Sequence, residues 1–172
     1  VEIRESDTLN PGFYFVDSIG FNLISFDKSL CKEPVKASDG KISVLLVEPN
    51  KYPKMIEIDD TLEAMQEVVG GDIEEYMPFE DEVAIICNEE GKITGMAPNR
   101  AVYEENSREM LDIICGKFFV AYAPFEAERF QSLPPDLAEK YREKFKYPER
   151  FMRVNNEIVA VPFKPVRADK ER

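Results

Sequence analysis

Histidine is absent from this sequence of 172 residues. Histidine is the commonest general base of enzymes, the usual activator of serine and cysteine nucleophiles, and the commonest protein ligand of metal ions. Its absence excludes, within these residues, any catalytic triad that needs an imidazole and any zinc site with a histidine ligand. The sequence therefore does not identify a reaction, and it favours association over bond-breaking chemistry.

Cysteine is scarce: only Cys31, Cys87 and Cys115 occur, and no two of them form a Cys-x-x-Cys motif. Three scattered thiols do not make a four-cysteine zinc site. Cys87 and Cys115 stand in apolar runs and are predicted to be structural core thiols. Cys31 lies in a polar stretch, where we expect it to be exposed, and an odd exposed thiol is typical of a reducing cytoplasm rather than of secretion.

Long apolar runs are missing as well. No stretch of about 18 apolar residues occurs, so the sequence predicts no membrane span. The N-terminal residues lack the basic start and apolar core of a signal peptide. The first residue is valine, so we expect further residues to precede it. These features predict a cytoplasmic protein that does not bind membranes.

Negative charge, by contrast, is plentiful and unevenly placed. The formal net charge is −12, and the segment from Glu48 to Glu90 alone carries a net charge of −12. From Gln131 onward the chain is net positive, at +3. Such a field repels nucleic acid and attracts basic surfaces, although acidic residues also serve solubility alone. The predicted acidic interaction surface comprises Asp72, Glu74, Glu75, Glu80, Asp81 and Glu82.

The same carboxylates allow two other interpretations. Oxygen ligands of this kind bind calcium or magnesium, but the Asp-x-Asp-x-Asp-Gly spacing of a calcium loop is absent. A hydrolase using Glu80 and Glu82 is the weakest hypothesis, because no paired-carboxylate geometry follows from one sequence. We expect a solvated loop, with no metal and no cofactor.

The apolar periodicity predicts an α+β fold: a mixed, mainly antiparallel sheet with two helices packed on it. The predicted helices span Asp60–Val69 and Leu133–Lys146. Asp60 is the expected N-cap of the first helix, with Glu63 as its capping-box partner, and Gly70-Gly71 ends it. Ser132 is the expected N-cap of the second. Strands are predicted at 42–47, 54–58, 72–79 and 83–88, and residues 112–115 and 117–122 are predicted as another pair of strands or as one bulged strand. Residues 92–95 are predicted as a hairpin arm, 97–103 as a loop running into a short strand, and 151–161 as a hairpin around Asn155-Asn156.

Three regions are expected along the chain. Residues 1–41 form an N-terminal extension, with short strands broken at Asp17-Ser18 and a polar linker from residue 28. Residues 42–163 form the main α+β domain. Residues 164–172 form a charged tail.

The most site-like residues follow the second buried strand. Asn88, Lys92, Asn99, Arg100 and Tyr103 are the candidate ligand-binding residues, since a planar guanidinium beside amides suits a carboxylate or a phosphate. In the alternative interpretation, Asn99 caps a turn and Arg100 pairs with one of the many acids. The aromatic and basic stretch from 141 to 153 has the composition of a base-stacking surface, but core packing explains its aromatics better.

Several segments resemble a bacterial and phage family, the domain of unknown function numbered 3846, over roughly residues 42–145. The resemblance rests on Val44–Pro49, Leu62–Gly71, Cys87–Lys92, Gly95–Ala101 and Ile114–Val120. It implies a protein of gut Firmicutes, their mobile elements and phages, sometimes found beside antirestriction-type proteins. It implies no activity and no catalytic residue, but it draws attention to Asn88, Asn99 and Arg100, which stand in the shared motifs.

Two functional hypotheses follow. The first is a non-enzymatic interaction protein of a mobile element, whose acidic surface engages a basic or nucleic-acid-binding protein, as an antirestriction-like mimic would. It predicts no direct nucleic-acid binding. The second is a domain that binds a small anionic ligand or nucleotide in a pocket near Asn99 and Arg100.

Overall fold

The computed structural model describes residues 2–3, 10–16, 20–25, 40–107 and 109–165. The chain divides into two units, residues 1–37 and 38–172. The predicted break at Asp17-Ser18, Cys31 and nearly all of the predicted linker lie outside the described residues. In chain order the elements are β1 (Glu2–Ile3), β2 (Gly12–Val16), β3 (Phe21–Ile24), β4 (Lys41–Val47), β5 (Lys54–Asp59), α1 (Leu62–Val69), β6 (Ile73–Tyr76), β7 (Val83–Asn88), β8 (Pro98–Tyr103), β9 (Met110–Cys115), β10 (Phe118–Tyr122), α2 (Pro135–Lys144), β11 (Glu149–Val154) and β12 (Glu157–Pro162).

The first unit is a small antiparallel sheet in the order β1-β2-β3. The centre of the second unit is a five-stranded antiparallel sheet in the order β5-β4-β10-β7-β6. With two helices packed against it, this sheet confirms the predicted α+β fold.

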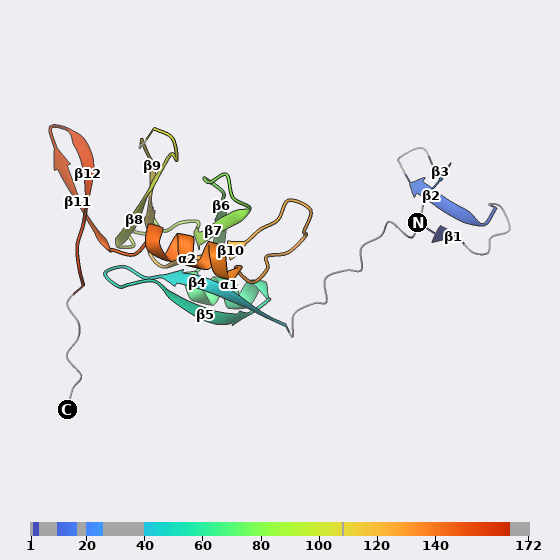
Figure 1. Cartoon of the computed structure of the whole chain (residues 1–172), viewed down its shortest axis with the longest axis horizontal. Helices are drawn as coiled ribbons and strands as arrows, with labels where there is room; N and C mark the ends of the chain where they lie inside the picture. The colour runs from blue at the N-terminus through green and yellow to red at the C-terminus, as the bar shows by residue number, and fades with distance from the viewer. Residues whose placement is uncertain (1, 4–9, 17–19, 26–39, 108, 166–172) are drawn as a thin grey trace, which may run out of the picture. The chain divides into compact units, whose positions relative to one another are not determined.

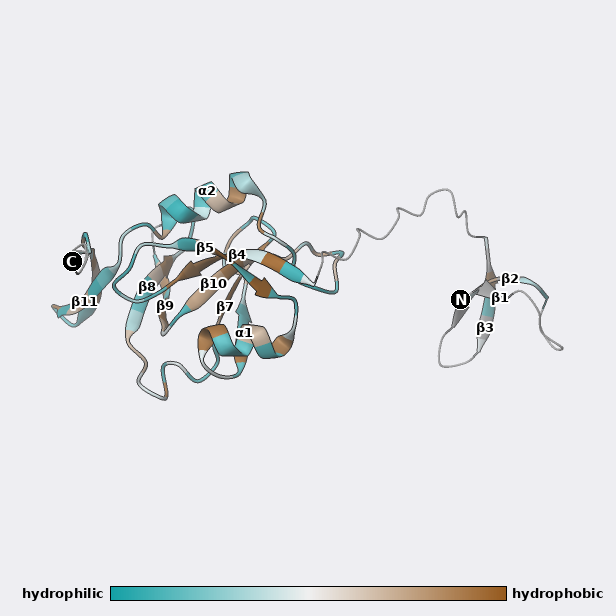
Figure 2. Ribbon diagram, turned by 90° about the horizontal axis from the view of Figure 1, so that it is seen from below, coloured by the Kyte–Doolittle hydropathy of each residue, from teal (hydrophilic) through white to brown (hydrophobic). Residues whose placement is uncertain are grey.

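The three inner strands of the main sheet are apolar on both faces because a helix covers each face (Figure 2). One face carries Leu45, Ile85 and Val120, which pack with α2 and with β8 and β9. The other face carries Val44 and Phe119, which pack with α1. Burial on both sides explains why these strands read as continuous apolar runs rather than as an alternating pattern.

Helix α1 has its N-cap one residue later than predicted. Its N-cap is Thr61, whose Oγ1 accepts a hydrogen bond from the Ala64 amide at 3.2 Å. The predicted cap, Asp60, is used elsewhere: its amide donates to the Gly40 carbonyl and its carboxylate pairs with Arg129. The capping box with Glu63 is therefore wrong. The predicted stop is confirmed, since Gly70 has the left-handed φ of 80° that ends a helix.

Helix α2 also lacks the cap predicted for it. The N-cap position is Pro134, which makes no side-chain capping bond. Ser132 was the predicted cap, but its hydroxyl accepts a hydrogen bond from the Ser43 amide at 3.0 Å. A hydrogen bond to β4 thus takes the place of a local cap.

A second sheet, formed by β8 and β9, corrects two further predictions. Residues 92–95 are a series of turns, with the Thr94 amide donating to the Glu90 carbonyl, and not a hairpin arm. Strands β9 and β10 are adjacent in sequence but belong to different sheets, because Gly116, at a φ of 81°, turns the chain between them. A Cβ at Gly116 would lie 2.6 Å from the Met96 sulfur, so only glycine fits this turn.

The chain then forms the predicted hairpin. Strands β11 and β12 pair through six residues each, and the turn residues Asn155 and Asn156 both have positive φ, at 47° and 69°. Such a pair of left-handed residues is the signature of a tight hairpin turn. The hairpin extends away from the main sheet (Figure 1).

Candidate functional site

The predicted ligand-binding arginine lies inside the protein. Arg100 on β8 is 1% exposed, and each of its three side-chain nitrogens donates a hydrogen bond. Nε donates to the Phe145 carbonyl at 3.0 Å and Nη2 to the Lys51 carbonyl at 2.8 Å. Nη1 donates to the carbonyl and side-chain oxygens of Asn99. The guanidinium therefore joins the end of α2, the β4–β5 turn and β8.

Asn99 continues this network. It is 1% exposed, and its Nδ2 donates to the carbonyls of Val47 at 3.0 Å and Gly116 at 2.7 Å. Burial lowers the pKa of Arg100 to about 10, although the negative charge of Glu149 acts to raise it. The guanidinium therefore remains cationic at neutral pH. The Glu149 carboxylate accepts the Ala101 amide, and burial raises its pKa.

The other three candidate ligand residues lie apart from this network. Asn88 is buried at the end of β7, where its Oδ1 accepts the Glu90 amide at 2.9 Å and closes a turn. Lys92 is exposed and pairs with Asp112 at 2.6 Å. It lines a shallow hollow of about 370 Å³ that none of the other four residues lines. Tyr103 ends β8 and is half-buried. A shared ligand pocket at these residues stays a prediction.

The six acids of the predicted interaction surface do not share one face. Side chains alternate along a strand, so β6 directs Glu75 toward the α1 side of the sheet together with Ile73, while Glu74 lies beside Cys87 on the opposite side. Asp72 accepts a hydrogen bond from Gln66 at 2.9 Å, and Glu80 is exposed.

Asp81 and Glu82 instead hold the fold together. Asp81 accepts hydrogen bonds from Lys140 at 2.5 Å and from the Tyr141 hydroxyl at 2.9 Å, and the Lys140 bond lowers the pKa of the Asp81 carboxyl. Glu82 accepts the hydroxyl of Tyr122 and the amide of Phe125. These contacts fix α2 and the segment after β10 against the start of β7.

A groove that no sequence pattern indicated lies on the α1 side of the sheet, with a volume of about 610 Å³. Three segments form it: the start of α1, strand β6 with Met77, and residues 123–130, the loop between β10 and α2 in Figure 1. Its large apolar lining residues are Leu62, Met65, Ile73, Met77, Phe125 and Phe130. Phe125 is 80% exposed, Leu62 52% and Met77 37%, so apolar surface faces solvent here.

Carboxylates dominate the polar lining of this groove. The groove is lined by four carboxylates and by a single cationic side chain, that of Arg129. The carboxylates belong to Asp60, Glu63, Glu75 and Glu128. Arg129 already pairs with Asp60 at 3.5 Å, which leaves the other three acids without a salt bridge inside the described residues. We call this feature the acid-rimmed groove. Only Glu75 belongs also to the acidic set predicted from the sequence. Phe125 directly follows the apolar run 118–124, so nothing in the sequence marked its ring as exposed.

The described residues contain no cluster of three or more cysteine, aspartate or glutamate side chains that could hold a metal ion. Within the same part of the chain, neither helix is long and apolar enough to cross a membrane.

The two described cysteines differ in exposure. Cys87 is buried and Cys115 half-buried, and both are free thiols. Burial raises the pKa of Cys87 to about 11, with the Glu74 charge adding to it. At pH 8 we expect Cys87 to react with iodoacetamide about a hundredfold more slowly than an exposed thiol, because the thiolate is the nucleophile. Mass spectrometry of the native and the urea-unfolded protein measures this, and equal labelling of both states would contradict it.

The fold and the groove define an antiparallel α+β domain with an acid-rimmed surface site. Residues 42–146 match the family Domain of unknown function (DUF3846), and the chain belongs to this family. The match confirms the resemblance in the sequence and covers the main sheet, both helices and the groove. Neither a curated protein nor a solved structure matches the chain.

Proposed function

We propose that this domain is a non-enzymatic binding module, and that its acid-rimmed groove takes a basic, amphipathic segment of a protein partner. The observation that carries the proposal is that exposed Leu62, Met77 and Phe125 line one groove together with three carboxylates that have no salt bridge to any described residue. Exposed apolar surface in a concave site, surrounded by polar residues, is typical of protein interaction sites.

The apolar lining supplies the affinity in this proposal. Aromatic side chains are enriched among the residues that dominate binding energy, and Phe125 is held at the surface because Glu82 accepts its amide hydrogen bond at 3.1 Å. Met77, which lines the same groove, adds an adaptable side chain. A partner that covers these residues removes them from water.

The carboxylates supply the selectivity. A net charge of −12 attracts a basic partner over long range and repels the phosphates of nucleic acid. A partner with lysine or arginine residues flanking an apolar stripe meets Glu63, Glu75 and Glu128 at the rim. Proteins that bind nucleic acid carry such basic surfaces, so they are the proposed partner class, and a mimic of their ligand is the proposed role in mobile elements.

The alternative, a small anionic ligand at Asn99 and Arg100, has less support. The donors of both side chains are already bonded to carbonyl oxygens, and both residues are 1% exposed. An anion would have to displace these bonds and open the interior.

The test uses a labelled synthetic helical peptide of lysine and leucine, with the leucines on one face, and a counterpart with glutamate in place of lysine. Fluorescence anisotropy is expected to show binding of the lysine peptide only, weakening as salt rises because exposed charges are screened. Substituting Glu63→Gln, Glu75→Gln and Glu128→Gln together is expected to weaken binding about tenfold.

The matched control neutralises three exposed acids outside the groove, Glu57→Gln, Glu89→Gln and Glu90→Gln, and changes the net charge by the same amount. Equal weakening by both triple variants would refute a local site. For the apolar part, Phe125→Ala is expected to weaken binding more than about fivefold. Ile93→Ala removes an 87% exposed side chain outside the groove, and it is expected to leave the affinity for the peptide unchanged.

A further inference from the structure

We infer that the β11–β12 hairpin is a self-association surface, through which two copies of this chain pack face to face. The hairpin lies outside the residues that match the family, so this inference is independent of the groove. It starts from the register of the two strands, since residues directly opposite each other point to the same face of a sheet.

The register places one apolar pair at the centre of one face. Met152 lies opposite Val159, and Val154 and Val161 flank this pair along the two strands. All four are exposed, by 50%, 39%, 47% and 39% in that order. The other face carries Phe151 and Ala160, which are half-buried, and Ile158, which lies nearer the tip and is 50% exposed. The base of the hairpin is thus half-buried on one face only, and the Met152 face has no partner inside the described residues. An exposed apolar strand face of this kind is typical of association sites.

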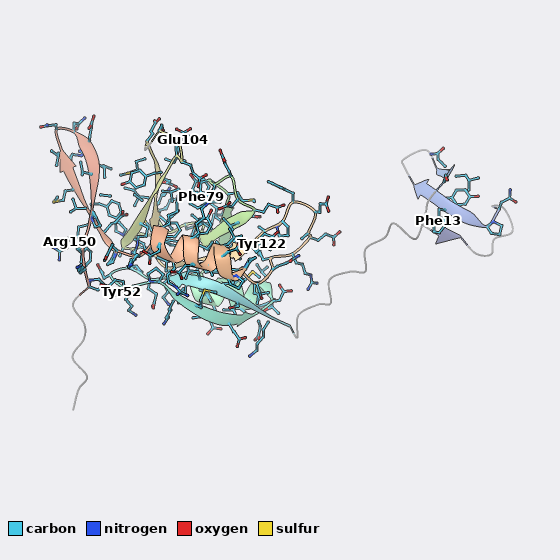
Figure 3. The ribbon with its side chains drawn as sticks, viewed as in Figure 1. Phe13, Tyr52, Phe79, Glu104, Tyr122 and Arg150 are labelled. Carbon is cyan, nitrogen blue, oxygen red and sulfur yellow. The ribbon has the colours of Figure 1, made fainter. Side chains whose placement is uncertain are left out.

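Opposite charges stand at the two ends of the exposed face. Arg150 pairs with Val161 at the base of the hairpin and Glu157 pairs with Val154 at its tip. Both charged side chains are exposed, and neither has an ion-pair partner in the described part of the chain. The Arg150 guanidinium lies 4.7 Å from the ring centre of Phe163, the residue that follows β12. Figure 3 labels Arg150 at the foot of the hairpin.

This arrangement is complementary to itself. When two hairpins pack face to face in opposite directions, the base of each covers the tip of the other. Arg150 of each copy then lies near Glu157 of the other copy, so the dimer contains two such pairs, one at each end. The valines and methionines lie between these pairs, at the spacing of two packed sheets. Packing in the same direction would place Arg150 on Arg150 and Glu157 on Glu157. The charges therefore select one two-fold arrangement, and a second copy is the occupant that fits.

A hairpin face of this length is smaller than the interfaces of permanent dimers, so the dimer is transient and depends on concentration. Sedimentation velocity of the full chain, over about two orders of magnitude in concentration, is expected to show a shift from monomer to dimer that saturates at two copies. Arg150→Glu and Glu157→Arg each place like charges at both ends of the interface. Each is expected to weaken dimerisation at least about tenfold.

Mixing these two variants is the decisive step. One Arg150→Glu copy and one Glu157→Arg copy restore opposite charges at both ends, so the mixture is expected to regain wild-type association. The matched control is Arg153→Glu, which makes the same charge change on the opposite face of the same strand and leaves dimerisation unchanged.

Three results would overturn the inference: a wild-type chain that stays monomeric, a mixture that fails to associate, or an Arg153→Glu variant as weak as Arg150→Glu. Docking of the hairpin into the acid-rimmed groove of another copy is the competing arrangement. It would give association that does not stop at two copies and that weakens when Glu75→Gln is introduced, and either observation would also reject the two-fold dimer. Thermal unfolding of each variant shows that the fold is retained.

Discussion

Replacing Arg100 by methionine is expected to lower the free energy of unfolding by about 4 kcal/mol, because the change leaves three interior backbone carbonyls without their donor. Methionine fills similar volume without donating a hydrogen bond, so the loss reports the polar network and not a cavity. A loss of this size removes much of the stability of a typical single domain, about 5–15 kcal/mol.

Urea denaturation followed by circular dichroism measures this effect as a fall in the transition midpoint at unchanged slope. Arg100→Lys is expected to cost about 2 kcal/mol, since one ammonium cannot reach acceptors on three segments in the fixed directions of a guanidinium. The control is Lys92→Met, which removes an exposed pair with Asp112 and costs less than about 0.5 kcal/mol. A methionine variant as stable as wild type would show that Arg100 is free to serve a ligand.

Arg100 also shows where sequence reasoning ends. The Pro98-Asn99-Arg100 segment stood out because a guanidinium beside an amide is suited to binding oxygen acceptors. The acceptors turned out to be backbone carbonyls of Lys51 and Phe145, which are 49 and 45 residues away along the chain. Every residue has a carbonyl, so no pattern in the sequence marks the two that Arg100 binds.

Local signals, by contrast, predicted the elements well. The apolar run at 42–47, the glycine stop at Gly70 and the asparagine pair at 155–156 each act through the conformation of a few neighbouring residues. The N-caps of both helices were predicted at the wrong residues, because the side chains expected to cap them make tertiary contacts instead. Asp60 pairs with Arg129, and Ser132 bonds to β4. Local capping preferences are worth about 1 kcal/mol, which is small enough for such contacts to override.

The acid-rimmed groove was missed for a related reason. The start of α1 and strand β6 are close in sequence, but residues 123–130 are separated from them by the whole of β7, β8, β9 and β10, and the sheet order brings the three segments together. A helix of eight residues is too short to cover the full face of the sheet, which leaves room for the groove beside α1. The excess of negative charge around it was visible in composition, but its position was not.

The second large effect concerns the aromatic cluster under α2. Phe145 is 2% exposed, and its ring centre lies 5.3 Å from that of Phe118 in an edge-on arrangement and 6.3 Å from those of Phe79 and Tyr141. Phe145→Ala is expected to lower the free energy of unfolding by about 4 kcal/mol, because it removes buried surface and leaves a cavity between packed rings. Phe145→Leu is expected to cost about 1.5 kcal/mol. Phe125→Ala deletes the same ring from an 80% exposed position, so its cost stays below about 0.5 kcal/mol.

The stability losses caused by substituting Arg100 and Phe145 are expected to be coupled, because the Phe145 carbonyl accepts the hydrogen bond of Arg100 Nε. Loosening the ring of Phe145 lets the end of α2 move, and the same movement lengthens the bond to the guanidinium. In a double-mutant cycle with the milder changes Arg100→Lys and Phe145→Leu, the combined loss should fall short of the sum by about 1 kcal/mol. Strict additivity would mean that ring packing and the guanidinium network hold α2 independently, and the proposed joint anchor at its C-terminal end would then be wrong.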